Sequence, residues 1–131
     1  MKTTRLLILM LCVATAAQAQ VGSSDDVLSD LVKPFAAGDA KTLAVYFAPS
    51  IDFDILGKEN VYSKQQATQV LQGFFDNNTP KSFSIRHRGG KDVMKYAVYS
   101  LVSTDAKKFR VTIFVKTEEK LIRQVRIETE Q

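Results

Sequence analysis

The second half of the chain constrains the fold most, because it reads as consecutive strands joined by short turns. After Pro80, apolar and polar residues alternate in stretches separated by Gly89-Gly90, by a turn at residues 104–106 and by Glu118-Glu119. Strands connected so closely pair with antiparallel neighbours, so the pattern predicts an antiparallel meander with one apolar face. The predicted strands cover residues 81–88, 93–103, 108–117 and 120–129.

The first half of the chain predicts helices that cover this apolar face. An amphipathic first helix contains Pro34, which predicts a kink or a split because proline lacks the backbone N–H. A second helix is expected over residues 40–48 and a first strand over residues 50–56. The third helix begins at a capping box formed by Ser63 and Gln66. The order of elements predicts an α+β fold with helices on one side of the sheet.

The amino terminus has the pattern of a secretory signal peptide. Lys2 and Arg5 precede an apolar run at residues 6–14, and Ala17-Gln18-Ala19 supplies the small residues of a cleavage site. The apolar run is shorter than the roughly 20 residues that span a bilayer, so we expect no stable membrane insertion. We therefore predict a signal peptide at residues 1–19, cleavage after Ala19, and one periplasmic or extracellular domain at residues 20–131.

Cysteine content and charge narrow the function further. Cys12 is the only cysteine and falls in the predicted signal peptide, so the exported domain is expected to lack disulfides. Of 18 basic residues, Lys2 and Arg5 leave with the signal, so 16 remain against 14 acidic residues. So small an excess of positive charge does not indicate nucleic-acid binding.

Asp52 and Asp54 are candidate catalytic residues. They alternate with apolar residues, so a strand places both carboxylates on one face, about 7 Å apart. His87 is the only histidine and would continue the face of Phe83 and Ile85; one histidine with one aspartate can perform acid–base chemistry. The alternative is that the aspartates line a solvated or dimer-facing surface. No spacing typical of metal ligands occurs, so neither a metal nor a cofactor is predicted.

The polar face of the meander is a candidate ligand or partner surface. It combines basic side chains with aromatic ones, a mixture that favours an acidic ligand or a dimer interface. The residues assigned to it are Arg86, Arg88, Tyr99, Arg110, Phe114, Lys116 and Arg126.

Two pairs of segments carry a resemblance to known proteins. The segments FAAGDAKTLAVYFAPSIDFDI (residues 35–55) and SKQQATQVLQGFF (residues 63–75) resemble the nuclear-transport-factor-2-like superfamily. The segments FSIRHRGG and YAVYSLVSTDAKKFRVTIFVK resemble an uncharacterised family of secreted bacterial proteins with this fold. The resemblance implies a cone-like curved antiparallel sheet packed on three helices, also described as cystatin-like. It further implies a pocket at the mouth of the cone and homodimers through the exposed sheet face.

Isomerases of that superfamily use an aspartate base, a tyrosine and a protonated aspartic acid. This trio cannot be placed on the chain, because no carboxylate lies between Asp92 and Asp105 or between Asp105 and Glu118. The sequence therefore favours an exported, non-catalytic domain that binds a small apolar or acidic ligand, or a partner, and forms a homodimer. The alternative is a small acid–base enzyme, of isomerase or dehydratase type, that uses Asp52 or Asp54 with His87.

Overall fold

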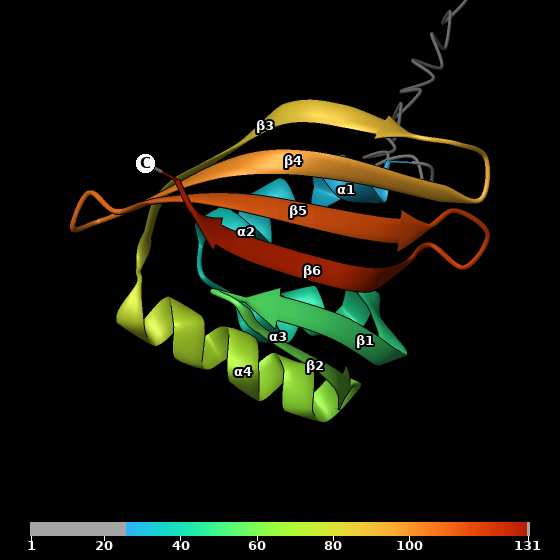
Figure 1. Cartoon of the computed structure of the whole chain (residues 1–131), viewed down its shortest axis with the longest axis horizontal. Helices are drawn as coiled ribbons and strands as arrows, with labels where there is room; N and C mark the ends of the chain where they lie inside the picture. The colour runs from blue at the N-terminus through green and yellow to red at the C-terminus, as the bar shows by residue number, and fades with distance from the viewer. Residues whose placement is uncertain (1–25, 131) are drawn as a thin grey trace, which may run out of the picture.

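A computed structural model describes residues 26–130, and the predicted signal peptide and its cleavage site lie outside them. Within this range the chain forms short helices first and a meander of strands last (Figure 1). The helices are α1 (Val27–Asp30), α2 (Val32–Ala36), α3 (Ala40–Leu43), the 3-10 helix η1 (Ala44–Tyr46) and α4 (Lys64–Asn77). The strands are β1 (Phe47–Ile55), β2 (Lys58–Ser63), β3 (Pro80–Gly90), β4 (Met94–Ser103), β5 (Lys108–Lys116) and β6 (Leu121–Thr129).

The strands form one curved sheet in the order β2-β1-β6-β5-β4-β3. Helices α1, α2 and α3 lie behind this sheet in Figure 1, and its other face is uncovered. We call these the covered face and the outer face. The predicted α+β fold with a curved sheet on helices is confirmed. One pair differs from the predicted antiparallel sheet: β1 runs parallel to β6, which makes the sheet mixed.

The first helix splits as Pro34 predicts. α1 ends at Asp30 and α2 begins at Val32, with Leu31 between them. A proline at position 34 cannot donate to the carbonyl of Asp30, four residues earlier, so the helix is interrupted there.

The second helix is shorter than predicted, and the strand after it starts earlier. β1 begins at Phe47 and includes Pro49, whereas the sequence predicted a helix up to residue 48 and a strand from residue 50. β2 pairs with β1 only from Ser50, and the register with β6 shifts between Phe47 and Asp52. The proline therefore lies where the ladder is irregular, the position in a sheet that tolerates its missing N–H.

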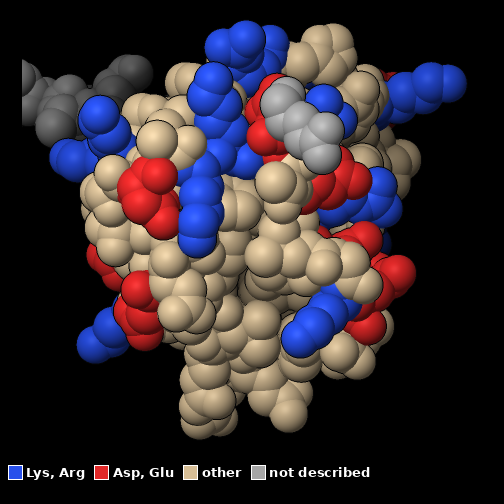
Figure 2. Space-filling model, turned by 60° about the vertical axis from the view of Figure 1, so that its left-hand side comes forward, with Lys and Arg blue, Asp and Glu red and all other residues tan. Residues whose placement is uncertain are grey.

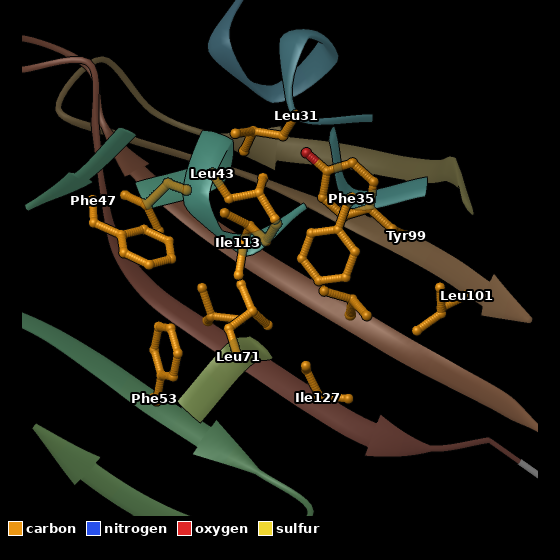
Figure 3. Packing of buried hydrophobic residues seen from close by; sticks show 14 of the residues in the cluster. Leu31, Phe35, Leu43, Phe47, Phe53, Leu71, Tyr99, Leu101, Ile113 and Ile127 are labelled. Atoms are coloured by element: carbon orange, nitrogen blue, oxygen red, sulfur yellow. The ribbon is translucent and has the colours of Figure 1, made fainter. Parts of the chain in front are cut away.

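Aromatic rings fill the space between the helices and the covered face. Phe35 stacks on Phe83 with ring centroids 4.3 Å apart, and Phe83 stacks on Tyr99 at 4.6 Å. Figure 3 shows Phe35 and Tyr99 surrounded by aliphatic residues from both layers. Burial of these side chains supplies most of the driving force for folding.

Charged side chains are unevenly distributed over the end of the molecule that carries the β4–β5 turn. Figure 2 shows lysines and arginines gathered toward the top of this view, at the level of β3 in Figure 1. The lower part, at the level of α4, is largely uncharged, because α4 is rich in glutamine and has few charged residues. The capping box predicted for α4 is present, with Ser63 and Gln66 bonded reciprocally.

Candidate functional site

A bulge in β3 decides which side chains reach each face of the sheet. Ile85 pairs with Tyr99 but His87 pairs with Val98, so Arg86 is an extra residue in the strand. After such an insertion the inward and outward alternation moves by one residue. Arg88 consequently turns to the covered face, and His87 lies on the outer face. The prediction that His87 continues the face of Phe83 and Ile85 was wrong for this reason.

The β3–β4 and β5–β6 connections lie at the same end of the sheet (Figure 1). A pocket of about 210 Å³ lies at this end, lined in part by the start of α1. We call it the mouth pocket. Its lining comes from the start of α1, from β3, β4 and β5, and from the β5–β6 turn. The lining residues are Asp26, Val27, Leu28, Arg88, Lys95, Val115, Thr117 and Lys120.

The base of the mouth pocket is apolar. Val27, Leu28 and Val115 are each less than one-tenth exposed, and we call them the apolar floor. Next to them, the hydroxyl oxygen of Thr117 is buried and has no hydrogen-bond partner among the described residues. A buried hydroxyl without a hydrogen-bond partner costs free energy. A ligand that hydrogen-bonds to Thr117 would remove this cost.

The entrance of the mouth pocket is positively charged. Arg88, Lys95 and Lys120 line it, and we call them the basic rim. Arg88 donates to Asp26 at 2.8 Å and to the hydroxyl of Ser29. The hydrogen bond from Arg88, and a smaller contribution from Ser29, lower the pKa of Asp26. Arg88 therefore keeps the Asp26 carboxylate ionised at the pocket and forms an ion pair with it.

Tyr99 belongs to the core rather than to a ligand surface, which corrects its predicted assignment. It is 0% exposed, and its hydroxyl donates to the carbonyl oxygen of Leu28 at 2.7 Å. Its partner across the strands is Val111, which is also buried. The tyrosine thus ties α1, and with it one wall of the mouth pocket, to the centre of the sheet.

Replacing Tyr99 by phenylalanine should lower the free energy of unfolding by about 1 kcal/mol at neutral pH, because the buried Leu28 carbonyl loses its donor. Burial raises the pKa of Tyr99 above its ordinary value of 10.0. A group with a raised folded pKa contributes its stability fully below the unfolded pKa and loses it as pH rises. Urea denaturation between about pH 8 and pH 11 should therefore show a smaller alkaline loss of stability in Tyr99→Phe than in wild type. Equal losses would contradict this assignment.

The outer face carries a half-buried strip formed by Tyr96, Val98, Thr112 and Phe114, which we call the outer strip. Its two aromatic rings lie 5.4 Å apart, and His87 lies 6.0 Å from Tyr96. The sequence analysis placed Phe114 here. Apolar groups on an uncovered sheet face are typical of contact surfaces.

Of the five cations assigned to the polar face, Arg88 lies on the covered face instead, and three of the other four pair with carboxylates, so the outer face is less basic than predicted. Of the predicted cations, Arg86 has no ion pair within residues 26–130. Exposed pairs of this kind contribute little to stability but cancel the local charge. The pairs are Arg88–Asp26, Arg110–Glu128, Lys116–Glu119 and Arg126–Asp54.

The candidate acid–base residues do not converge. Asp52 and Asp54 project to the outer face, as predicted, because Phe53 between them is buried. His87 is on the same face, but β6, β5 and β4 separate its strand from theirs. Four strand spacings place them about 19 Å apart. This distance is too long for shared acid–base chemistry. One carboxylate oxygen of Asp52 is buried and has no hydrogen-bond partner within residues 26–130.

A second, more open pocket of about 460 Å³ lies at the opposite end of the sheet, on the side seen in Figure 2. Lys107 at its edge pairs with Asp105 at 3.3 Å. The described residues contain no cluster of side chains suited to a metal ion. Between residues 26 and 130, no helix is long and apolar enough to cross a membrane.

The fold defines a class of small α+β domains in which a curved sheet wraps around helices, known as cystatin-like or nuclear-transport-factor-2-like. Residues 28–128 match a family described as "Domain of unknown function (DUF4783)", and the chain belongs to this family. No curated protein matches the chain.

Solved structures agree with this assignment. A DUF4783 family protein from Bacteroides ovatus is 28% identical, with a TM-score of 0.72 over 77% of this chain and 93% of that one. An uncharacterised protein with a cystatin-like fold from Silicibacter pomeroyi is 12% identical, with a TM-score of 0.63 over 82% of this chain and 75% of that one. A protein described as "Rd1NTF2_04 with long sheet" is 14% identical, with a TM-score of 0.66 over 80% and 99%. The latter two likenesses concern the fold alone.

The sequence analysis missed Asp26, Lys95, Thr117 and Lys120 as pocket residues. They come from one helix start, one strand and one turn, and only the paired strands bring them together. The one available signal was Gly89-Gly90, which marks the hairpin that carries Arg88 and Lys95.

Proposed function

We propose that the protein is an exported, non-catalytic binding domain that holds a small ligand in the mouth pocket. The observation that carries this proposal is a pocket that combines the apolar floor with a charged entrance and the buried Thr117 hydroxyl, which has no hydrogen-bond partner in the described part of the chain. Ligand sites typically combine an apolar surface with a few polar groups that orient the ligand.

The arrangement of titratable groups favours binding over catalysis. An acid–base mechanism needs two groups within hydrogen-bond reach of one substrate. His87 is separated from Asp52 and Asp54 by three strands, and none of these three residues lines the mouth pocket. Arg88 and Asp26 in the pocket are engaged with each other.

Native mass spectrometry of protein purified from its own compartment tests the proposal. A tryptophan in place of Thr117 should fill the pocket and abolish retention of a small molecule that wild type carries. Thr68→Trp is the control, because it makes the same change at a half-buried threonine of α4, outside the pocket and the outer strip, and should retain the ligand. A wild type without a ligand, or equal retention by both variants, would contradict the proposal.

We also propose that two copies of the chain associate through the outer face. The outer strip supplies an uncovered apolar and aromatic centre. Charges flank it unequally: Asp52 and Asp54 lie toward β1, whereas Arg86 and His87 lie on β3. If the two outer faces pack together around a two-fold axis that runs between them along the strands, the aspartates of each copy lie near the β3 edge of the other. The unpaired oxygen of Asp52 would then find a donor.

Phe114→Glu should convert such a dimer to a monomer in sedimentation velocity, because it places a charge in the centre of the apolar contact. Val45→Glu is the control: Val45 is 68% exposed and lies in η1, away from the outer face, so its variant should sediment as wild type does. A wild type that stays monomeric at every concentration would exclude the dimer.

A further inference from the structure

We propose that the mouth pocket binds a small organic carboxylate, with the carboxylate group at the basic rim and the apolar body on the apolar floor. This inference rests on the function proposed above and names the chemistry of the ligand.

The charge balance of the pocket favours an anion. Three cations line it against the single carboxylate of Asp26, which Arg88 already engages at 2.8 Å. Within residues 26–130, neither Lys95 nor Lys120 forms an ion pair. All three cations are solvent-exposed, so each attracts an anion only modestly, and the attraction depends on the three acting together.

The backbone at Lys120 supports a role for its side chain. Lys120 has a φ of 57°, in the left-handed region that favours glycine, and its N–H donates to the carbonyl of Lys116 at 2.8 Å. A glycine would complete this turn with less strain. The chain instead has a lysine whose side chain lines the pocket, and unfavourable backbone conformations of this kind cluster at functional positions.

The geometry of the polar groups suits a carboxylate in particular. A carboxylate has two acceptor oxygens on one planar group, which can accept from the ammonium groups of Lys95 and Lys120 together. The terminal nitrogens of Arg88 already donate to Asp26 and Ser29, so Arg88 contributes positive charge rather than a free fork. The buried hydroxyl of Thr117 offers one further donor at the border of the apolar floor. The carboxylate of Asp26 remains in the lining, so a singly charged ligand meets less repulsion than a phosphate dianion.

Nuclear magnetic resonance titration of the ¹⁵N-labelled protein tests the inference, with phenylacetate, neutral phenylacetamide and phenyl phosphate as probes. Phenylacetate should shift the amide signals of Val115 and Thr117 saturably. It should bind at least about tenfold more tightly than the amide, because charge-assisted hydrogen bonds are lost with the charge.

Two variants should change the affinity in opposite directions. Lys120→Gly should weaken phenylacetate binding roughly fivefold without lowering the melting temperature, because glycine suits the backbone there. Asp26→Asn should tighten binding, since it removes the competing anion and asparagine caps a helix as well as aspartate does. Lys81→Ala is the control: this exposed lysine lies outside the pocket, so its loss should leave the affinity unchanged.

The outcomes separate this inference from the proposed function. Equal affinities for phenylacetate and phenylacetamide at the pocket would overturn the carboxylate assignment and leave a ligand site in place. If phenyl phosphate bound more tightly than phenylacetate, the carboxylate inference would be overturned, and the inferred class of ligand would be a phosphate ester. If no probe shifts the pocket signals saturably, the carboxylate inference is overturned, and ligand retention in the Thr117→Trp comparison then decides the proposed function separately.

Discussion

Phe35→Ala is expected to lower the free energy of unfolding by about 3–5 kcal/mol, the range for removing a fully buried phenylalanine. Phe35 is 1% exposed, stacks on Phe83, and meets Phe75 edge to face with centroids 5.0 Å apart. Alanine would leave a cavity between α2 and the sheet and would remove both ring contacts. Urea denaturation followed by circular dichroism measures this loss.

Val45→Ala supplies the control for the core substitution. Val45 is 68% exposed, so its variant should stay within about 0.5 kcal/mol of wild type. If Phe35→Ala lost no more stability than Val45→Ala, the claim that the Phe35 ring packs at the centre of the core would be contradicted.

Gly90→Ala is expected to cost about 3 kcal/mol or more, because it combines backbone strain with a clash. Gly90 has a φ of 107°, and an added Cβ would lie 2.4 Å from the carbonyl oxygen of Met94 and 2.7 Å from Cα of Lys95. The β3–β4 hairpin would have to open, which would also displace Lys95 from the basic rim. Thermal denaturation measures the loss of stability, and titration with phenylacetate the loss of affinity.

Gly57→Ala separates strain from clash in this prediction. Gly57 has a φ of 85°, but no atom lies within 4 Å of an added Cβ. Its variant should therefore cost only the strain, about 1 kcal/mol. Equal losses at Gly57 and Gly90 would show that close backbone packing at the hairpin contributes nothing.

Local signals predicted much of the fold correctly. The capping box of Ser63 and Gln66 and the interruption near Pro34 depend on neighbouring residues, and each occurs as the sequence indicated. The alternation in the second half likewise gave the meander, because period-2 burial is a local property.

The errors arose where distant residues decide the structure. The parallel pairing of β1 with β6 joins strands more than 65 residues apart, and no local pattern specifies it. The bulge at Arg86 reverses the faces of His87 and Arg88, because a single inserted residue shifts every side chain after it. Tyr99 was assigned to the wrong face because its polar hydroxyl masks a fully buried ring whose partner, the Leu28 carbonyl, lies 71 residues away.

The candidate site shows the same limit more strongly. Asp52 and Asp54 share a face as alternation predicts, yet Arg126 stands 3.6 Å from Asp54. The segment of β1 that carries these aspartates is therefore part of a sheet surface with an ion pair between β1 and β6. The mouth pocket takes residues from α1, three strands and a turn, so its existence follows only from tertiary structure.

A crystal structure of the protein grown with phenylacetate tests the central claim most directly. The account predicts the carboxylate among Arg88, Lys95 and Lys120, within hydrogen-bond distance of the Thr117 hydroxyl, and the ring on the apolar floor. An empty mouth pocket, with phenylacetate bound on the outer strip or nowhere, would contradict it.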